Sequence, residues 1–241
     1  MRELEAAGSA QCRKIYARHG APVGNVFGVK FADINRIAKA IKRDHELARR
    51  LWRGGNYDAR NLAVKVADPS AMDAAELQEW VADVDNYMHA GFVGQLGALS
   101  PAALEVLEGW TLSEAEFVRN AGYSLLGSLV KERPELLGDD GGAAFLVRIE
   151  AEIHSSPNWA RYGMNWALIA VGTYKEGLTE AAVAAAERIG AVDVDHGETS
   201  CKTPAAGPYI RKAVAHIRDR EARRAAKSAR SAPPARRDGV Q

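Results

Sequence analysis

Residues 155–172, SSPNWARYGMNWALIAVG, contain the pattern that decides the fold. Ser156 followed by Pro157 is typical of a helix start, because serine caps free backbone N–H groups and proline has none to lose. Trp159 and Trp166 lie seven residues apart, about two helical turns, so their side chains share one side of the helix. The stretch therefore predicts a helix with an aliphatic face and, beside it, an aromatic edge.

The aromatic edge also includes Tyr162, and Arg161 and Asn165 lie nearby. Aromatic planes next to a cation and an amide are typical of surfaces that bind nucleic acids. The alternative is that both tryptophans belong to the core, because tryptophan is mostly buried in folded proteins. These residues alone leave both interpretations open.

The rest of the chain predicts helices on both sides of this stretch. Capping residues begin several of them, and we expect these caps at Asp44, Asn56, Asp73, Thr179 and in a Ser113–Glu116 capping box. The pattern gives about eleven or twelve helices, in pairs with short joins and no convincing strand, as in an α-solenoid of HEAT or armadillo repeats. An irregular helical bundle is the alternative. The expected fold class is all-α.

The chain of 241 residues is long enough to bury a sizeable core. We expect a flexible lead-in at residues 1–8, one solenoid domain over 9–230 whose last helix is basic, and a disordered basic tail over 231–241. No apolar run approaches the length of a membrane span, and the first residues do not resemble a secretion signal. Two distant cysteines, Cys12 and Cys201, form no disulfide framework, so a cytoplasmic location is expected.

The charge is distributed unevenly along the chain. Residues 1–65 carry 14 Lys/Arg against 6 Asp/Glu, residues 66–210 carry 8 against 22, and residues 211–241 carry 10 against 3. Basic ends of this kind suit a polyanionic partner. The alternative is that the charged faces only keep the chain in solution.

Four blocks of sequence resemble a known family: VFGVKFADINRIAKAI, ARRLWRGGNYDARNLAVKVA, FVRNAGYSLLGSL and IHSSPNWARYGMNWALIAV. In this order and spacing they resemble the AlkD-type DNA alkylation repair proteins, which are HEAT-like-repeat DNA glycosylases. The resemblance implies a curved solenoid with a basic groove that holds duplex or structured DNA. It implies no metal and no other cofactor, and we expect a monomer.

Active members of that family remove cationic alkylpurines, and an aspartate stabilises the positive charge that develops on the sugar. By resemblance, Trp166 matches a tryptophan that lines the deoxyribose, and Arg119 matches an arginine that assists on the backbone. The catalytic block of the family corresponds to residues 85–92, where Tyr87 falls on a tryptophan position and Gly91 falls on the aspartate position.

The candidate catalytic residues are therefore Trp166, Tyr87 and Asp85, and Asp83 or His89 could also replace the missing acid. Because glycine cannot stabilise a cation, the sequence predicts DNA binding with weak or absent glycosylase activity. One alternative is a non-enzymatic binder of branched or damaged DNA. Another is a helical-repeat scaffold that binds a protein through its acidic middle.

Candidate DNA-binding residues are Trp166 and a set of cations that could contact phosphates: Arg36, Lys39, Arg43, Arg119, Arg161, Lys202, Arg211 and Lys212. If they do, binding will weaken steeply with salt. The alternative is that they form solvated faces.

The segment 193–202 contains four side chains that could bind a metal ion, namely Asp195, His196, Glu198 and Cys201. Mixed metal sites seldom come from one short loop, so we expect none here. We expect instead a structural loop in which Asp and Thr side chains accept hydrogen bonds from backbone N–H groups. A contact with DNA or a partner is a third interpretation.

Overall fold

The structure is a computed structural model that describes residues 1–22 and 24–231. In these residues all regular structure is helical, and an isolated bridge between Gly8 and Val29 is the one β-type pairing. The α-helices are α1 (Arg2–Ala6), α2 (Ala10–Arg18), α3 (Phe31–Ile41), α4 (His45–Arg53), α5 (Tyr57–Val66), α6 (Ala74–Ala82), α7 (Tyr87–Leu99), α8 (Ala103–Thr111), α9 (Glu116–Glu132), α10 (Asp139–Glu152), α11 (Asn158–Tyr174), α12 (Thr179–Ile189) and α13 (Ala206–Ser231). Short 3-10 helices cover Pro69–Ala71, Pro134–Leu136 and Glu176–Leu178.

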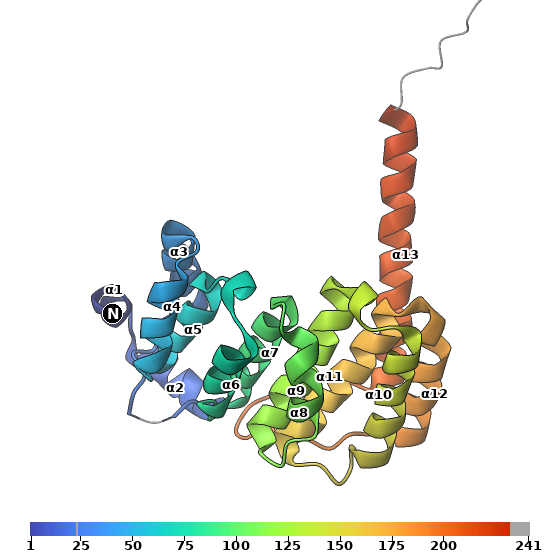
Figure 1. Cartoon of the computed structure of the whole chain (residues 1–241), viewed down its shortest axis with the longest axis horizontal. Coiled ribbons are helices and arrows are strands. Elements are labelled where there is room, and N and C mark those ends of the chain that lie inside the picture. Colours follow the sequence, from blue (N-terminus) through green and yellow to red (C-terminus); the bar gives the residue numbers. More distant parts are fainter. Residues whose placement is uncertain (23, 232–241) are drawn as a thin grey trace, which may run out of the picture.

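The helices form two layers along a row (Figure 1). In one layer α3, α5, α7, α9, α11 and α13 each contact the next. In the other layer α4, α6, α8, α10 and α12 each pack against the odd-numbered helix that follows. Such helix pairs, each packed mainly on its neighbours, form an α-solenoid. The predicted fold class is confirmed.

Three predicted helix caps are confirmed. The side chains of Asp44, Asn56 and Asp73 accept hydrogen bonds from the backbone N–H groups of Leu47, Ala59 and Glu76, at the starts of α4, α5 and α6. These caps act within a few residues, so sequence is sufficient to find them.

The caps predicted at Ser113, Ser156 and Thr179 are wrong, since α9, α11 and α12 begin without a capping side chain of their own. The reason is tertiary contact. Glu116 does not return to its own helix start; its Oε1 accepts a hydrogen bond from the N–H of Trp159, 2.7 Å away, and so caps α11 from α9. Ser156 Oγ instead donates to the Glu152 carbonyl at 2.9 Å.

The lead-in expected at residues 1–8 contains a short helix. Residues 2–6 form α1, and Leu4 is buried in the main core with 1% exposure. The next loop is held by Asp58, which is fully buried on α5 and accepts hydrogen bonds from three successive backbone N–H groups. These belong to Phe27, Gly28 and Val29, at 2.7, 3.0 and 2.8 Å from its carboxylate oxygens.

Three further tryptophans belong to the core. Trp52, Trp80 and Trp110 are 0%, 2% and 2% exposed. Trp52 and Trp80 stack in parallel, with ring centroids 4.5 Å apart and an interplanar angle of 5°. They join α4 to α6, so aromatic as well as aliphatic side chains hold the layer of even-numbered helices together.

Residues 190–205, which we call the strap, connect α12 to α13 and cross the start of α11. Asn158 exchanges two hydrogen bonds with the backbone of Asp195 at 2.9 and 2.7 Å, and Gly197 lies against the Arg18 carbonyl of α2. The predicted structural loop is confirmed, because Asp195 and Thr199 side chains accept from backbone N–H groups two residues ahead. No group of three or more His, Cys, Asp or Glu side chains is placed to hold a metal ion in the described residues.

The last helix, α13, begins packed in the body and then projects away from it (Figure 1). Within the described residues, no helix is both long and apolar enough to cross a membrane. The basic tail predicted over 231–241 lies outside the described residues, apart from Ser231 at the end of α13.

Candidate nucleic-acid interface

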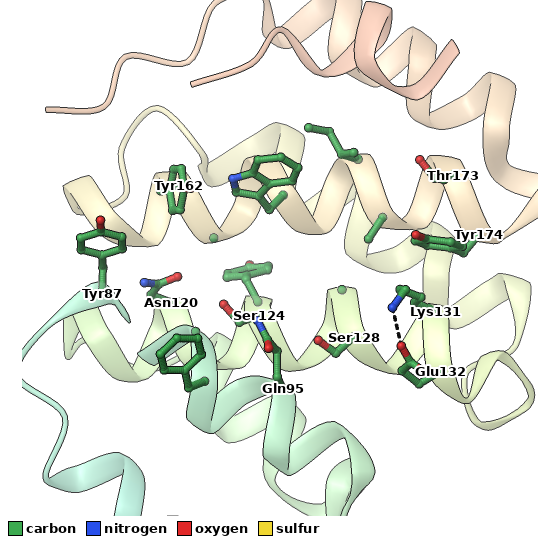
Figure 2. A pocket seen from close by; sticks show the side chains of 18 of the residues that line it. Tyr87, Gln95, Asn120, Ser124, Ser128, Lys131, Glu132, Tyr162, Thr173 and Tyr174 are labelled. Carbon is green, nitrogen blue, oxygen red and sulfur yellow. Dashed lines mark hydrogen bonds and ion pairs between the residues drawn. The ribbon is translucent and has the colours of Figure 1, made fainter. Parts of the chain in front are cut away.

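A groove of about 830 Å³ runs between α7, α9 and α11 and ends at α13 (Figure 2). Glycines bring its walls together. A Cβ atom at Gly94 of α7 would lie 2.4 Å from the Ala121 carbonyl oxygen of α9, and one at Gly163 of α11 would lie 2.6 Å from Asn120 Oδ1. Only glycine permits these approaches, so α9 sits deep between its neighbours and its side chains form the floor of the groove.

The groove is lined mainly by aromatic, apolar and uncharged polar side chains, with one Lys–Glu pair at its end. Figure 2 shows Tyr87 at one end, Tyr162 above Asn120, and Lys131, Glu132 and Tyr174 at the other end. The polar lining comes from Gln95, Asn120, Ser124, Ser128 and Thr173. Hydrogen-bonding amides and hydroxyls beside exposed rings can contact bases and sugars without adding charge.

Five rings, which we call the aromatic row, follow one another from α7 to α13: Tyr87, Trp159, Tyr162, Trp166 and Tyr209. Tyr87 and Trp159 stack with centroids 3.9 Å apart at an angle of 7°. The later neighbours meet edge to face at 5.7, 6.3 and 5.3 Å. The sequence predicted an aromatic edge on α11, and the structure extends it to two further helices.

Two predicted site residues come together, because Tyr87 and Trp166 line the same groove. Both are half-buried, so Trp166 is neither a core residue nor a fully exposed one. Trp159 packs beneath Tyr87 and meets the ring of His196 on the strap, with centroids 5.8 Å apart. It supports the groove rather than lining it.

Tyr87 is a neutral phenol at physiological pH. Burial, followed by the neighbouring Tyr162, raises its pKa to about 12. Its hydroxyl is hydrogen-bonded to His19 Nδ1 at 3.1 Å. Tyr87 therefore lines the groove as a neutral ring and supplies no negative charge there.

The position of the missing acid is open space. Gly91 lines the groove, and a Cβ atom built on it would have no heavy atom within 4 Å. Asp85 is exposed, accepts a hydrogen bond from Asn86 Nδ2 at 2.8 Å and does not line the groove. Asp83 is paired with Arg60 on α5 at 3.2 Å. Neither aspartate takes the place of Gly91.

His89 also points elsewhere. It is 1% exposed and lies against the rings of Trp52 and Tyr57, at centroid distances of 5.8 and 4.7 Å. Burial, followed by the nearby Arg60, lowers its pKa to about 4, so it is neutral in the fold. His89 is a core residue, and the prediction that it could replace the acid is wrong.

Arg119 lies outside the groove. Its guanidinium donates to the Ser113 carbonyl at 2.8 Å and to Ser156 Oγ at 3.3 Å, which ties the loop before α9 to the start of α11. Its side chain is 14% exposed. Arg161 is half-buried and likewise absent from the groove lining.

The other predicted cations fall into two groups. Arg36, Arg43 and Arg211 are paired with Glu3, Asp68 and Glu187 at 3.2, 3.1 and 2.8 Å. Lys39, Lys202 and Lys212 are exposed. None of these six lines the groove, which is therefore aromatic and nearly neutral rather than basic.

Sequence reasoning missed Tyr209 and Asn120 as groove residues. Tyr209 is 42% exposed and stands against Trp166 from α13. Asn120 follows Arg119 directly and reaches the floor of the groove, so its position next to a family-matched residue was the available signal.

Residues 1–217 match the family model described as DNA alkylation repair enzyme. The chain belongs to this family. An uncharacterized protein of Listeria innocua is 31% identical over 216 residues, covering 88% of this chain and 94% of that protein. A second, from Listeria monocytogenes, is 28% identical over the same coverage.

A solved structure agrees with the fold and the family. It belongs to a new family of proteins related to the HEAT-like repeat DNA glycosylases, with affinity for branched DNA structures. It is 32% identical to this chain with a TM-score of 0.82, and the match covers 90% of this chain and 93% of the other. The predicted resemblance to HEAT-like-repeat glycosylases is confirmed.

Proposed function

We propose that this DNA alkylation repair family member binds branched DNA through its groove and does not excise alkylated bases. The observation that carries the proposal is Gly91. It occupies the catalytic aspartate position of the resemblance, faces the groove and leaves open space where a carboxylate would be needed.

Excision of a cationic alkylpurine builds positive charge on the sugar, and enzymes stabilise such charge with a fixed anion. Among the described residues, Glu132 is the one acidic side chain in the groove lining. It is bound to Lys131 at 2.5 Å, at the end of the groove remote from Tyr87 (Figure 2). A neutral Tyr87 beside Gly91 supplies no replacement, so the chemical step lacks its stabilising charge.

The groove is better suited to binding. Half-buried rings accept the faces of bases or deoxyribose, and each base stacked on an aromatic side chain contributes about 1–3 kcal/mol. A branch point exposes base faces that an intact duplex keeps stacked. The solved relative with affinity for branched structures supports the same preference in this chain.

Binding is tested by fluorescence anisotropy with a labelled four-way junction and a linear duplex of the same length and composition. We expect the junction to bind at least tenfold more tightly at moderate salt. Equal affinity for both would contradict the preference for branches. No binding to either DNA would favour the alternative of a protein-binding scaffold.

Catalysis is tested by incubating methylated duplex with a stoichiometric amount of protein and measuring free methylpurine. A known alkylpurine glycosylase serves as the positive control, and buffer gives the spontaneous background. We expect release at background. Release above it that is abolished in the Trp166→Ala variant would make the protein an enzyme and overturn this half of the proposal.

A further inference from the structure

The helix α13 changes character along its length. Near its start Ile210 is fully buried against Gly172 of α11, and Tyr209 and Ala213 line the end of the groove. From Arg218 onward the side chains that the structure describes are exposed, and the helix stands away from the body (Figure 1). The second half of α13 is therefore a solvent-exposed arm attached at the groove.

The face of α13 that lines the groove continues into a row of cations. Arg220 lies seven residues after Ala213 and eleven after Tyr209, which places it on the same side of the helix. The same helical spacing brings further cations to that side. We call them, with Arg220, the basic stripe: Arg220, Arg223, Arg224 and Lys227.

The opposite side of α13 is neutralised by the body of the protein. Arg211 is paired with Glu187 at 2.8 Å, and Arg218 lies 3.6 Å from Glu176. The stripe residues are exposed and make no ion pair with any side chain in the described part of the chain. The charge that remains available on this helix is thus on the side that continues the groove.

The composition of the arm indicates what can bind it. Residues 218–231 contain six Lys/Arg and two Asp/Glu, and their apolar side chains are all alanine. A helix that binds in a membrane interface or in an apolar protein groove needs large apolar residues on one face. This one has none, so its complementary surface is a polyanion.

We propose that the basic stripe binds the sugar-phosphate backbone of a DNA arm that leaves the groove. The inference rests on the proposed function, because it takes DNA to be the ligand of the groove. From Tyr209 to Lys227 the helix rises about 27 Å, which corresponds to roughly eight phosphates along one strand. The stripe lies beyond residue 217, where the match to the family ends.

The test compares two full-length double variants that remove the same charge from the same helix. Arg220→Gln with Lys227→Gln removes two stripe cations, and Arg211→Gln with Arg218→Gln removes the two paired cations of the opposite side. Glutamine keeps the helix propensity, and circular dichroism checks helix content. Junction affinity is then measured over a range of salt concentrations.

We expect the stripe variant to bind about tenfold more weakly, with a salt slope smaller by about two, because two phosphate contacts are lost. The control variant should stay within about twofold of wild type. Equal losses in both variants would mean that only net charge matters and would overturn the inference. So would wild-type affinity in the stripe variant, whereas a wild-type protein that binds no DNA would refute the proposed function itself.

Discussion

Two stacked aromatic pairs have nearly the same geometry and opposite surroundings. Trp52 and Trp80 lie 4.5 Å apart at 5°, and Tyr87 and Trp159 lie 3.9 Å apart at 7°. The first pair is buried in the core between α4 and α6. The second joins α7 to α11 and is half-exposed at the groove.

The difference shows what each stack contributes. Around Trp52 the remaining contacts are all internal, including the Arg60 guanidinium 4.8 Å from its ring centroid and His89 at its edge. Tyr87 instead begins a row of rings that continues along the groove. The buried stack stabilises the fold, whereas the exposed stack fixes one end of a surface on which a ligand can bind.

The largest expected effect is on the buried stack. Trp80→Ala should lower the free energy of unfolding by about 3–5 kcal/mol, because it removes a large buried side chain and leaves a cavity. Urea denaturation measures this loss. Trp159→Ala, the matched change in the half-exposed stack, should cost less, about 2 kcal/mol, because the half-buried ring loses less buried area; equal losses would show that both stacks are structural.

His89, which lies at the edge of Trp52 in the buried stack, should make the free energy of unfolding depend on pH. Its pKa is about 4 in the fold and about 6.5 in an unfolded chain, so between these values the unfolded state binds more protons. Stability contributed by neutral His89 is present above pH 6.5 and should fall by roughly 3 kcal/mol as the pH is lowered to 4. Denaturation at several pH values measures this, and His89→Gln should flatten the profile over that range.

The exposed row should affect binding more than stability. Trp166→Ala is expected to weaken junction binding about 5- to 100-fold, corresponding to the loss of one stacked base or sugar. Trp166→Phe keeps a ring and should retain most of the affinity. If Trp166→Ala binds like wild type at every salt concentration, the groove is not where DNA stacks.

The smallest expected effect distinguishes two glycines of α7, Gly91 and Gly94, whose surroundings differ. Gly91→Ala should stabilise the protein by about 0.5–1 kcal/mol, because alanine favours the helix and its methyl group meets open space. Gly94→Ala, one turn later, should destabilise it, since the Cβ atom would collide with the α9 backbone. Thermal denaturation compares the two; a loss of stability in Gly91→Ala would mean that the groove is closed at this point.

The fold class was predictable from sequence because helical spacing and local caps act over a few residues. The caps at Asp44 and Asn56 bind backbone N–H groups only three residues ahead, so the local sequence is enough to identify them. The cap that Glu116 provides to α11 joins residues 43 positions apart and therefore has no local signal. The same holds for the Asp58 carboxylate that anchors the Gly28 loop, 30 positions away.

The site was predictable only in part, for the same reason. Trp166 and Tyr87 were found through the family resemblance, and Gly91 identified the missing acid. Tyr209 reaches Trp166 from a helix 43 residues further along the chain. The charge asymmetry indicated a polyanion, but it could not show that the groove itself is nearly neutral and that exposed cations of α13 continue from its end.

The strap has a consequence for how the chain unfolds. In a solenoid whose repeats contact only their neighbours, each end can fray on its own. Here Gly197 lies next to the Arg18 carbonyl, so the chain between them forms a loop of about 180 residues. The entropic cost of closing a loop grows only slowly with its length. The first and last thirds of the molecule are thereby coupled, so the protein should melt as one cooperative unit.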